Sequence, residues 1–310
     1  MIAITVIIPV YNGEKTISET LESVLKQTYN NFEIVIVNDG STDTTQVILN
    51  DYAEQDSRIK VISQKNSGVS AARNNGIVHS EGKYVCFLDA DDMYSKTFLE
   101  KMYEKITKNN MDICYCGYNV LPITKNNEVR KKYDVFTYEN ILENYIKGRL
   151  PAHTSTWLIK SSVIKNNNIL FEENVSWGED QEFFYKVLAC SNKVTFVSEY
   201  LTFYRNEELE SRLSYFSLDK IDQDYDFIMR VVNNSFINRD SKIEKSLLEY
   251  KLPALLTYNL LIALASGYSR TQVLNYYEKY KKYLSGYEWV NGFRSLKLNL
   301  SKVKLKIKLC

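Results

Sequence analysis

The sequence predicts an α/β fold with a mostly parallel central sheet and helices on both of its faces, followed by a mostly helical C-terminal region. Short apolar, β-branched runs alternate with segments of helical spacing, and within each run consecutive positions are apolar. Strands buried on both faces have this pattern, and they occur in parallel sheets that helices cover. From about Ser214 onward helical spacing dominates and tyrosine recurs, which predicts the C-terminal region.

The first third of the chain accounts for four strands and three helices in alternation. The predicted strands are residues 3–10, 32–37, 60–63 and 84–88, and the predicted helices are residues 15–27, 44–55 and 70–80. A polar cluster follows each strand. Because the carboxyl ends of parallel strands share one edge of a sheet, the four clusters are expected to meet there, where ligands bind in such folds.

The middle of the chain mixes both types of element. We expect strands at residues 112–121 and 194–204, a helix at residues 179–189 and a polar surface loop at residues 125–132. The expected domains are residues 1–213 and a helical appendage, residues 214–310, with a basic tail. Within the first domain, a nucleotide half covers about residues 1–120 and an acceptor half about residues 121–213.

The composition is that of a globular protein, with 45% hydrophobic and 25% charged residues in a chain of 310. A net charge of +1 gives no general attraction to nucleic acid, so no such partner is expected. Five scattered cysteines indicate reduced thiols in the cytoplasm. The sequence starts without the charged leader of a signal peptide, and no apolar run appears long enough to span a bilayer. We therefore expect a cytoplasmic protein, peripheral on the inner face of the membrane.

The strand at residues 84–88 runs into an acidic cluster, Asp89-Ala90-Asp91-Asp92. Two carboxylates one residue apart can share Mg²⁺ or Mn²⁺ with a diphosphate, because these hard cations prefer oxygen ligands. The alternative is a helix N-terminus at which the acidic side chains complement the dipole and Asp92 is the cap.

Asp39 occupies the corresponding place after the strand at residues 32–37. A carboxylate there can accept the N–H of a uracil ring, and Gly40 permits a close turn. The alternative is an Asx-turn before a helix that Asp43 caps.

A third polar segment, Lys65 to Gly76, leads into a helix. Backbone N–H groups at a helix N-terminus attract phosphate, and Arg73 lies one turn inside, where it can reach an anionic oxygen. Simple helix capping by Gly68 and Ser70 is the alternative.

Four segments together resemble family 2 glycosyltransferases of the GT-A fold, of the kind found in bacterial polysaccharide biosynthesis: Pro9-Val10-Tyr11-Asn12, Val37 to Asp43, Asn66 to Asn74, and Leu88 to Asp92. They occur in the family's order and at similar spacing over about residues 1–205. The resemblance implies a Rossmann-like nucleotide half, a nucleotide-sugar donor and inversion at the anomeric carbon. It implies that Asp91 and Asp89 ligate the metal. It implies a nucleotide-sugar site formed by Pro9, Val10, Tyr11, Asn12, Asp39, Asn66, Gly68, Arg73, Asp89, Ala90 and Arg205.

A fifth segment, Trp177-Gly178-Glu179-Asp180, resembles the Glu-Asp motif of the same family, which carries the catalytic base. An inverting displacement needs one base to accept the proton of the acceptor hydroxyl, so Asp180 is the predicted base. Trp177, Glu179 and His153 are assigned to the acceptor side, although a structural role for His153 is an equal alternative. For Glu179 and Asp180 the alternative is a helix N-terminus with acidic residues that complement the dipole.

The segment Phe203-Tyr204-Arg205 resembles a family element near the diphosphate, in which a His often follows the Arg. Here Asn206 and Glu207 follow, so the third protein ligand to the metal is left open, with Glu207 as a candidate.

The tail, Lys297 to Leu309, alternates lysine with aliphatic residues, which is a strand-like period. Contact with an anionic membrane as a basic helix is favoured, because it would suit a lipid-linked acceptor. An edge strand protected by lysines and a solvated terminus are the alternatives. The tyrosine-rich helices before the tail could pack against a second copy as a homodimer.

The predicted function is transfer of a hexose or N-acetylhexosamine from a UDP-sugar, with Mn²⁺ or Mg²⁺, to a lipid-linked or oligosaccharide acceptor for a capsule, exopolysaccharide or teichoic-acid-type glycan. The alternative is a noncatalytic nucleotide- or glycan-binding partner that stabilises another glycosyltransferase. A dinucleotide-dependent oxidoreductase is disfavoured, because no Gly-x-Gly-x-x-Gly follows the first strand.

Overall fold

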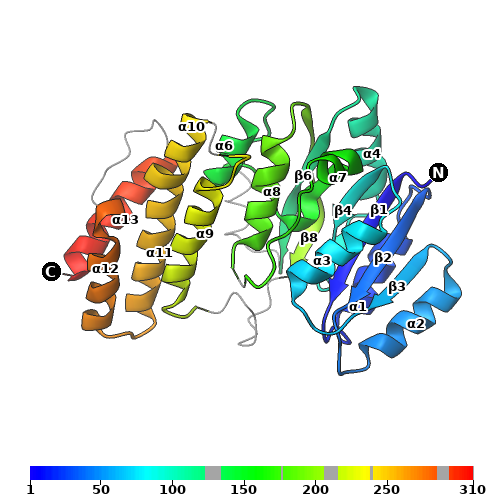
Figure 1. Ribbon diagram of the computed structural model, residues 1–310, viewed down its shortest axis with the longest axis horizontal. Helices are drawn as coiled ribbons and strands as arrows, with labels where there is room; N and C mark the ends of the chain where they lie inside the picture. Colours follow the sequence, from blue (N-terminus) through cyan, green and yellow to red (C-terminus); the bar gives the residue numbers. More distant parts are fainter. Residues whose placement is uncertain (123–133, 176, 206–215, 238–239, 285–292, 310) are drawn as a thin grey trace. The chain divides into compact units, whose positions relative to one another are not determined.

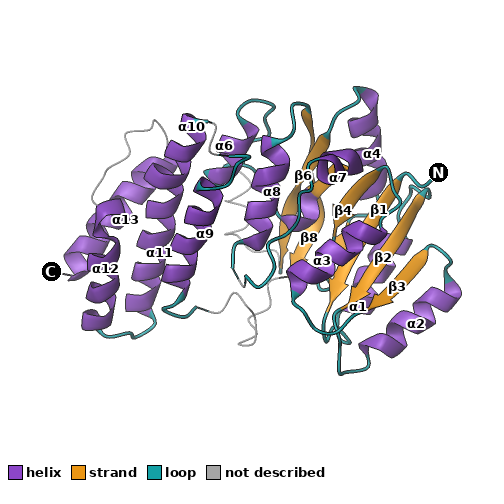
Figure 2. Cartoon of the chain, in the orientation of Figure 1, coloured by secondary structure: helices purple, strands orange, loops and turns teal. Residues whose placement is uncertain are grey.

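A computed structural model of the chain describes residues 1–122, 134–175, 177–205, 216–237, 240–284 and 293–309 (Figure 1). The chain divides into two compact units. Met1–Val175 and Glu179–Glu208 form the first, here called the α/β unit, and Ser176–Gly178 and Leu209–Cys310 form the second, the helical unit. Strands occur in the first, whereas the described elements of the second are helices (Figure 2). The loop expected at residues 125–132 lies outside the described residues.

The α/β unit contains an eight-stranded sheet in the order β3-β2-β1-β4-β7-β6-β8-β5. The four strands at one end are parallel: β1 (Ile4–Val10), β2 (Phe32–Asn38), β3 (Ile59–Ser63) and β4 (Tyr84–Phe87). The next strand, β7 (Trp157–Lys160), runs antiparallel to both β4 and β6 (Ile113–Leu121). The last two are β8 (Val194–Arg205), parallel to β6, and β5 (Met93–Tyr94), antiparallel to β8. The sheet is therefore mixed, because β7 reverses direction between the two halves.

Alternate side chains of β2 explain why its apolar run is continuous. Ile34 and Ile36 belong to the large core cluster that includes side chains of α1 (Ile17–Leu25), α2 (Thr45–Gln55) and α4 (Phe98–Lys108). Val35 and Val37 pack instead with Ala72 of α3 (Val69–His79). Successive strand residues point to opposite faces, so a strand covered on both faces is apolar throughout. The expected α/β fold with helices on both faces is confirmed.

The rest of the α/β unit adds short helices around the second half of the sheet. They are α6 (Ile141–Ile146), the 3₁₀ turn η1 (Thr154–Thr156), α7 (Ser161–Asn166) and α8 (Glu179–Ala189). The carboxyl ends of β1 to β4 point to one edge of the sheet, since these strands are parallel. The loops that follow them, and the start of α8, position the polar residues of the site.

In the helical unit, α11 (Leu252–Ala265) packs against α9 (Lys220–Val232), α12 (Arg270–Leu284) and α13 (Phe293–Leu309). Before α11 come α10 (Ser241–Lys245) and the π-helical turn η2 (Ser246–Lys251). The strand-like period of the tail is misleading, because residues 293–309 are helical: Lys302 and Leu305 are buried, and Val303 between them is 41% exposed. Tyr250 and Tyr280 are buried within the described part of this unit.

One described helix, Ser241–Ala265, is long and apolar enough to cross a membrane by length and composition, with a mean hydropathy of 1.3 over its apolar window. The sequence pattern predicts no such segment, since Glu249 and Lys251 interrupt the apolar run, but the helix continues through both. Half of that window is buried inside the protein.

Candidate active site

The loops after β1 and β2 are bonded to each other. The backbone N–H of Asn12 donates to Ser41 Oγ at 2.9 Å, and Asn12 Oδ1 accepts the N–H of Thr42 at 2.8 Å. Asn12 adopts a φ of +51°, a conformation in which asparagine is common. Tyr11 beside it is exposed. Of the first motif, Tyr11 and Asn12 therefore offer accessible side chains next to the β2 loop.

The other two residues of that motif, Pro9 and Val10, are buried within β1. The carbonyl of Val10 accepts the N–H of Asp39 at 2.8 Å. Their side chains belong to the sheet, so they act on the site through the backbone that sets the start of the loop.

Asp39 holds the loop between β3 and α3. Its Oδ1 accepts from Gln64 Nε2 and from the N–H of Ser67, and its Oδ2 accepts the N–H of Gly68, each at 2.8 Å. The residue is 3% exposed. A carboxylate can accept about four hydrogen bonds, so these three leave room for one further donor. In the same loop Asn66 and Gly68 are exposed.

The Asx-turn after β2 is formed by the preceding residue, Asn38, whose Oδ1 accepts the N–H of Ser41 at 3.0 Å. Asp43 accepts the N–H of Thr45 at 3.0 Å, where α2 begins. A turn and a capping carboxylate are thus both present, but neither uses Asp39, which leaves that side chain for the β3–α3 loop. Gly40 is at φ +74°, and a Cβ there would come within 2.8 Å of the Asn66 nitrogen.

Arg73 joins two parts of the site. It is 4% exposed on α3, and its Nη2 donates to Asp89 Oδ1 at 2.8 Å, while its Nη1 lies 3.5 Å from Glu179 Oε1. Burial disfavours the charged guanidinium, but the negative charges of Asp89, Glu179 and Asp180 outweigh burial and raise the pKa of Arg73. Arg73 therefore connects the loop after β4 with the start of α8.

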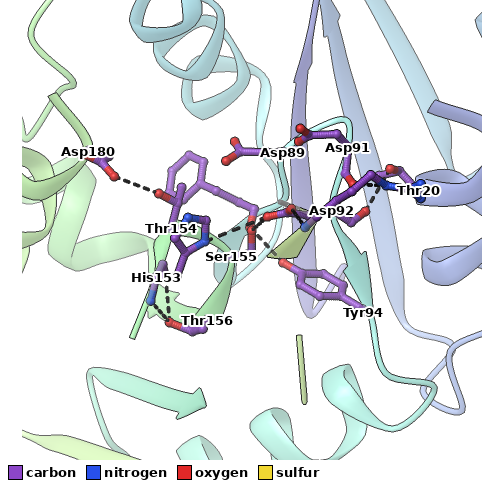
Figure 3. A network of polar contacts seen from close by, with 12 residues as sticks. Thr20, Asp89, Asp91, Asp92, Tyr94, His153, Thr154, Ser155, Thr156 and Asp180 are labelled. Carbon is purple, nitrogen blue, oxygen red and sulfur yellow. Dashed lines mark hydrogen bonds and ion pairs between the residues drawn. The ribbon is translucent and has the colours of Figure 1, made fainter. Parts of the chain in front are cut away.

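Asp180 lies in the first turn of α8. Its Oδ2 accepts the hydroxyl of Thr154 at 3.2 Å, and its Oδ1 accepts the N–H of Gln181 at 2.6 Å (Figure 3). Each carboxylate oxygen retains capacity for another hydrogen bond. Burial raises the pKa of the adjacent Glu179 and the charge of Asp180 adds to this rise, while Arg73 opposes both.

Asp89, Asp91 and Asp92 concentrate negative charge in the turn after β4 (Figure 3). Burial and then the charges of Asp89 and Asp91 raise the pKa of Asp92 well above its usual value. Burial acts in the same direction on Asp89, but the charges of Arg73 and His153 prevail and lower the pKa of Asp89. Ala90, between Asp89 and Asp91 in the sequence, is half-buried, and its carbonyl accepts the hydroxyl of Thr20 at 3.0 Å.

Asp92 is not the cap of a helix, since the short strand β5 follows it and α4 begins only at Phe98. It is 1% exposed, its Oδ2 accepts Ser155 Oγ at 3.0 Å, and its Oδ1 accepts the N–H of Arg205 at 3.1 Å. The carboxylate therefore ties the β4 turn to η1 and to the end of β8.

Arg205 and His153 lie beside this turn. Arg205 Nε donates to the carbonyl of Asp91 at 3.2 Å, and its Nη2 forms an ion pair with Glu19 of α1. The His153 ring contacts the rings of Tyr118 and Tyr204, and its Nδ1 lies 3.9 Å from Asp92 Oδ2. Glu207 lies outside the described residues.

Trp177 belongs to the helical unit, although it is only three residues before Asp180 in the sequence. Its Nε1 donates to Asp224 Oδ1 of α9 at 2.7 Å. Trp177 is thus anchored by its side chain within the helical unit, whereas Glu179 pairs with Arg73 within the α/β unit.

The acidic turn fits a hard divalent cation by the chemistry of its donors. Asp89 and Asp91 supply carboxylate oxygens, and after burial their charges are the next causes that raise the pKa of Asp92 beside them. Within the described ranges no group of three or more His, Cys, Asp or Glu side chains is arranged to hold a metal ion. An ion held by Asp89 and Asp91 would take further ligands from diphosphate and water, as is common for Mg²⁺.

Some partners in the site are not predictable from sequence spacing. Thr154 and Ser155, which bond to Asp180 and Asp92, lie in a short polar run after His153 with no motif of its own. Glu19, the partner of Arg205, is 186 positions away from it. For Ser155 a signal exists, because a buried carboxylate such as Asp92 requires hydrogen-bond donors.

Residues 5–166, more than half of the chain, match the sequence family described as glycosyl transferase family 2. EpsJ of Bacillus subtilis, an uncharacterized glycosyltransferase, is 33% identical over 211 residues, which cover 65% of this chain and 60% of EpsJ. WfgD of Escherichia coli is named UDP-Glc:alpha-D-GlcNAc-diphosphoundecaprenol beta-1,3-glucosyltransferase. It is 31% identical over 185 residues, which cover 54% of this chain and 71% of WfgD. The chain spans only 60% of EpsJ and 30% of GlyA of Streptococcus pneumoniae.

Among solved structures, Staphylococcus aureus TarS 1–349 in complex with UDP-GlcNAc superposes with a TM-score of 0.73 at 21% identity, covering 99% of this chain and 90% of that one. The mannosyltransferase PcManGT from Pyrobaculum calidifontis, in complex with GDP-Man and Mn²⁺, gives 0.60 at 17% identity, covering 98% and 87%. These likenesses confirm the predicted GT-A fold. With the sequence match over residues 5–166, they lead to one assignment: the chain belongs to glycosyl transferase family 2.

Proposed function

We propose that this chain is an inverting, metal-dependent glycosyltransferase that moves a hexose or N-acetylhexosamine from a UDP-sugar to an acceptor hydroxyl. One observation carries the proposal: buried Arg73 bonds Asp89 after β4 and lies 3.5 Å from Glu179, the neighbour of Asp180. Arg73, which can bind an anion, thereby links two parts of the site. One is the turn with the proposed metal ligands Asp89 and Asp91, and the other is the helix start with the proposed base Asp180. Membership of family 2 supports the same reaction class.

In the proposed reaction Asp180 accepts the proton of the acceptor hydroxyl as its oxygen attacks the anomeric carbon of the donor. A new C–O bond forms on one face of the sugar while the bond to the diphosphate oxygen breaks on the other, so the configuration inverts. Thr154 and the N–H of Gln181 hold the two Asp180 oxygens in place. Both contacts orient the base without consuming its remaining acceptor capacity.

The nucleotide is proposed to lie over the loops after β1 to β4. Asp39 has one acceptor position left for the N–H of a uracil, next to exposed Tyr11, and Asn66 and Gly68 border the same place. Asp91 and Asp89 would hold Mn²⁺ or Mg²⁺. When bound, that ion neutralises charge on the departing diphosphate. Arg73 and Arg205 supply further positive charge beside the acidic turn.

The acceptor is proposed to be a lipid-linked saccharide in the synthesis of a capsule, exopolysaccharide or teichoic-acid-type glycan, at the cytoplasmic face of the membrane. The name of WfgD specifies a diphosphoundecaprenol acceptor, and the TarS structure contains UDP-GlcNAc, which supports these classes by analogy. His153 and Trp177 remain proposed acceptor-side residues. A homodimer also remains a proposal, for which Tyr258, 64% exposed on α11, is an available contact.

The tail is proposed to contact anionic lipid through one face of α13. Leu300 and Val303 are 61% and 41% exposed, and Lys304 and Lys308 are exposed beside them. At 100° per residue these four positions fall on one side of the helix. An exposed stripe that combines aliphatic and lysine side chains is typical of helices that lie at a membrane surface.

Ligand-dependent thermal stability tests the donor part of this proposal. The full-length protein would be heated with a panel of UDP-, GDP- and dTDP-sugars, with and without Mn²⁺. A ligand that binds the native state raises its Tm, so one UDP-sugar with Mn²⁺ should give the largest increase. Equal Tm values across the panel would contradict nucleotide-sugar binding. A noncatalytic binding partner would show the increase but no release of UDP.

A further inference from the structure

Two adjacent hydroxyls of the 3₁₀ turn η1 bond to two acidic residues of the site, all within the α/β unit (Figure 3). Thr154 Oγ1 donates to Asp180 Oδ2 at 3.2 Å, and Ser155 Oγ donates to Asp92 Oδ2 at 3.0 Å. Thr154 is 2% exposed and Ser155 is 1% exposed. The hydroxyl that contacts the proposed base and the one that contacts the acidic turn therefore come from neighbouring residues.

The direction of β7 brings η1 to this edge of the sheet. β7 follows η1 directly and runs antiparallel to β4, with Tyr84 opposite Lys160 and Val85 opposite Ile159. The start of β7 therefore lies toward the carboxyl end of β4, after which the acidic turn begins. In an antiparallel strand it is the preceding segment that reaches the edge at which β1 to β4 end. η1 thus lies next to the end of β4, with which it is in contact.

η1 is closed by hydrogen bonds that involve neither of the two hydroxyls. The N–H and the hydroxyl of Thr156 both donate to the carbonyl of His153, at 3.0 and 2.7 Å, and the N–H of His153 donates to Thr156 Oγ1 at 2.9 Å. Directly after the turn, β7 pairs with β4 on one side and with β6 on the other. The backbone of η1 is therefore fixed to the sheet, and Thr154 and Ser155 extend from a rigid support.

On the acidic turn, Asp92 accepts hydrogen bonds from three elements. Thr20 Oγ1 of α1 donates to its carbonyl at 2.8 Å, and the N–H of Arg205 at the end of β8 donates to its Oδ1 at 3.1 Å. Ser155 of η1 donates to Oδ2, so both carboxylate oxygens have protein donors. Because Asp92 follows Asp91 directly in the chain, the position of Asp92 also sets that of a proposed metal ligand.

Packing alone does not require hydroxyls at these two positions. A buried hydroxyl costs free energy unless it is hydrogen-bonded, whereas valine or alanine would fill the same space without that cost. The proposed reaction, in contrast, needs the base beside the acceptor hydroxyl while the acidic turn lies beside the diphosphate. A misplacement of about 1 Å in a reacting group can cost about 100-fold in rate, so the separation of these two groups matters.

We infer that Thr154 and Ser155 are positioning residues through which η1 sets the separation between the acidic turn and the carboxylate of Asp180. This inference rests on the proposed function and adds to it a direct link between the metal side and the base side of the site. Neither hydroxyl touches substrate in this account. Their loss should therefore lower turnover and leave donor affinity nearly unchanged.

The test uses Thr154→Val and Ser155→Ala, which remove a hydroxyl with little change in shape, and the double variant. Thr154→Ser keeps the hydroxyl and tests for rescue. The control is Thr5→Val near the start of β1, at the other end of the parallel strands. Thr5 Oγ1 donates to the buried Glu33 at 2.6 Å, so the control loses the same kind of bond away from the site.

Two properties are measured on each full-length protein, well below its Tm. The first is UDP release, as kcat and donor KM at saturating Mn²⁺. The second does not depend on activity: it is the Mn²⁺ concentration that produces half of the additional rise in Tm in the presence of UDP, here called the Mn²⁺ midpoint.

We expect Thr154→Val to lower kcat at least about tenfold, with donor KM within about twofold and an unchanged Mn²⁺ midpoint. Thr154→Ser should remain within about threefold of the wild-type kcat. Ser155→Ala should lower kcat even at saturating Mn²⁺ and raise the Mn²⁺ midpoint at least about threefold, because the acidic turn loses a supporting bond. The double variant should lose less than the product of the two single losses, because both hydroxyls act through one turn. Thr5→Val should lower the Tm but keep kcat and the Mn²⁺ midpoint.

Wild-type kcat in Thr154→Val or in Ser155→Ala would overturn the inference and leave the proposed function intact. So would a double variant whose loss equals the product of the single losses, since the two hydroxyls would then act independently. A Thr154→Ser variant as slow as Thr154→Val would also overturn it, because packing and not the hydroxyl would then be decisive. A wild-type protein that releases no UDP from any donor overturns the proposed function itself, and the inference with it.

Discussion

The carboxylate of Asp39 accepts the backbone N–H of Gly68 at 2.8 Å, so the residue assigned to the uracil also shapes the loop that leads to Arg73. In the proposed site, recognition of the base by Asp39 and the position of Arg73 are therefore coupled by one side chain. Asp39 is 3% exposed, and three protein donors already surround it.

The first prediction follows from those three donors. In Asp39→Asn the amide NH₂ must face a backbone or glutamine N–H, so we expect asparagine to be nearly as disruptive as alanine. Losing charged hydrogen bonds of this kind costs about 2–4 kcal/mol, which lowers the Tm. Affinity for UDP, measured by calorimetry on folded protein, should fall more than about tenfold in both variants.

Asp43→Asn is the matched control for this prediction. Asp43 also accepts backbone N–H groups in a neighbouring loop, from Thr45 and Glu14, but it has no proposed contact with nucleotide. It should lose stability while retaining UDP affinity. An Asp39 variant that loses only Tm and binds UDP normally would show a purely structural role.

The second prediction concerns the acidic turn. In the wild type Mn²⁺ should add to the rise in Tm that UDP produces, because Asp89 and Asp91 would hold the ion together with the nucleotide. Asp91→Asn should abolish this additional rise and leave the metal-independent effect of UDP. Exposed Asp51 on α2, changed to asparagine, is the control for loss of one negative charge. An undiminished Mn²⁺ effect in Asp91→Asn would remove that residue from the metal site.

The third prediction is a pH dependence of stability. Burial raises the pKa of Asp224 to about 6, against the hydrogen bonds of Trp177 and Asn259 and the positive charges of Lys251 and Lys220. The folded protein therefore binds a proton on the Asp224 carboxyl more tightly than the unfolded chain does. The stability that this protonation contributes is complete below about pH 4 and is lost as pH rises through about 6.

Asp224→Asn removes that titration. As pH increases from 4 to 7, the wild type should lose stability relative to the variant by on the order of 3 kcal/mol, measured by chemical denaturation at each pH. A difference between the two proteins that does not change with pH would mean that Asp224 titrates normally.

The fourth prediction concerns the tail. Deleting it would uncover the core, because Lys302 and Leu305 of α13 are buried. Lys304→Glu together with Lys308→Glu changes only exposed positions. Each lysine near an anionic surface contributes about 1 kcal/mol, so binding to phosphatidylglycerol vesicles in a sedimentation assay should fall at least about tenfold. The control is the change to glutamate at exposed Lys83 and Lys108. An equal loss of vesicle binding in the two double variants would exclude a specific role for α13.

Much of the fold is predictable because the pattern of each element is local. Consecutive apolar residues in β1 and β2 reflect burial on both faces, and the helical spacing of residues 179–189 coincides with α8. The reversal at β7 is not predictable in this way, because strand direction depends on pairing between residues far apart in the sequence. The tail is a different case: its period of two is typical of a strand, but residues 293–309 form the helix that the favoured interpretation expected, and this helix packs against α11.

In the site, the motifs identified the acidic residues but not what holds them. The bond from Thr154 to Asp180 and that from Ser155 to Asp92 join segments that no local pattern connects. The hydrogen-bond partner of Trp177 is not predictable from sequence either. Because Trp177 is close to Glu179 and Asp180 in the chain, the motif assigns all three residues to one site. The partner of Trp177 is instead Asp224, 47 positions later in the chain.

Release of UDP from the UDP-sugar that stabilises the protein most, in the presence of Mn²⁺ and a lipid-linked saccharide, tests the central claim most directly. The wild type should release UDP and form a glycosylated product of inverted configuration. Asp180→Asn should bind the donor normally but lose at least about 100-fold in rate, because the proton acceptor is gone. Absence of UDP release with every donor, or turnover by Asp180→Asn at the wild-type rate, would contradict the account.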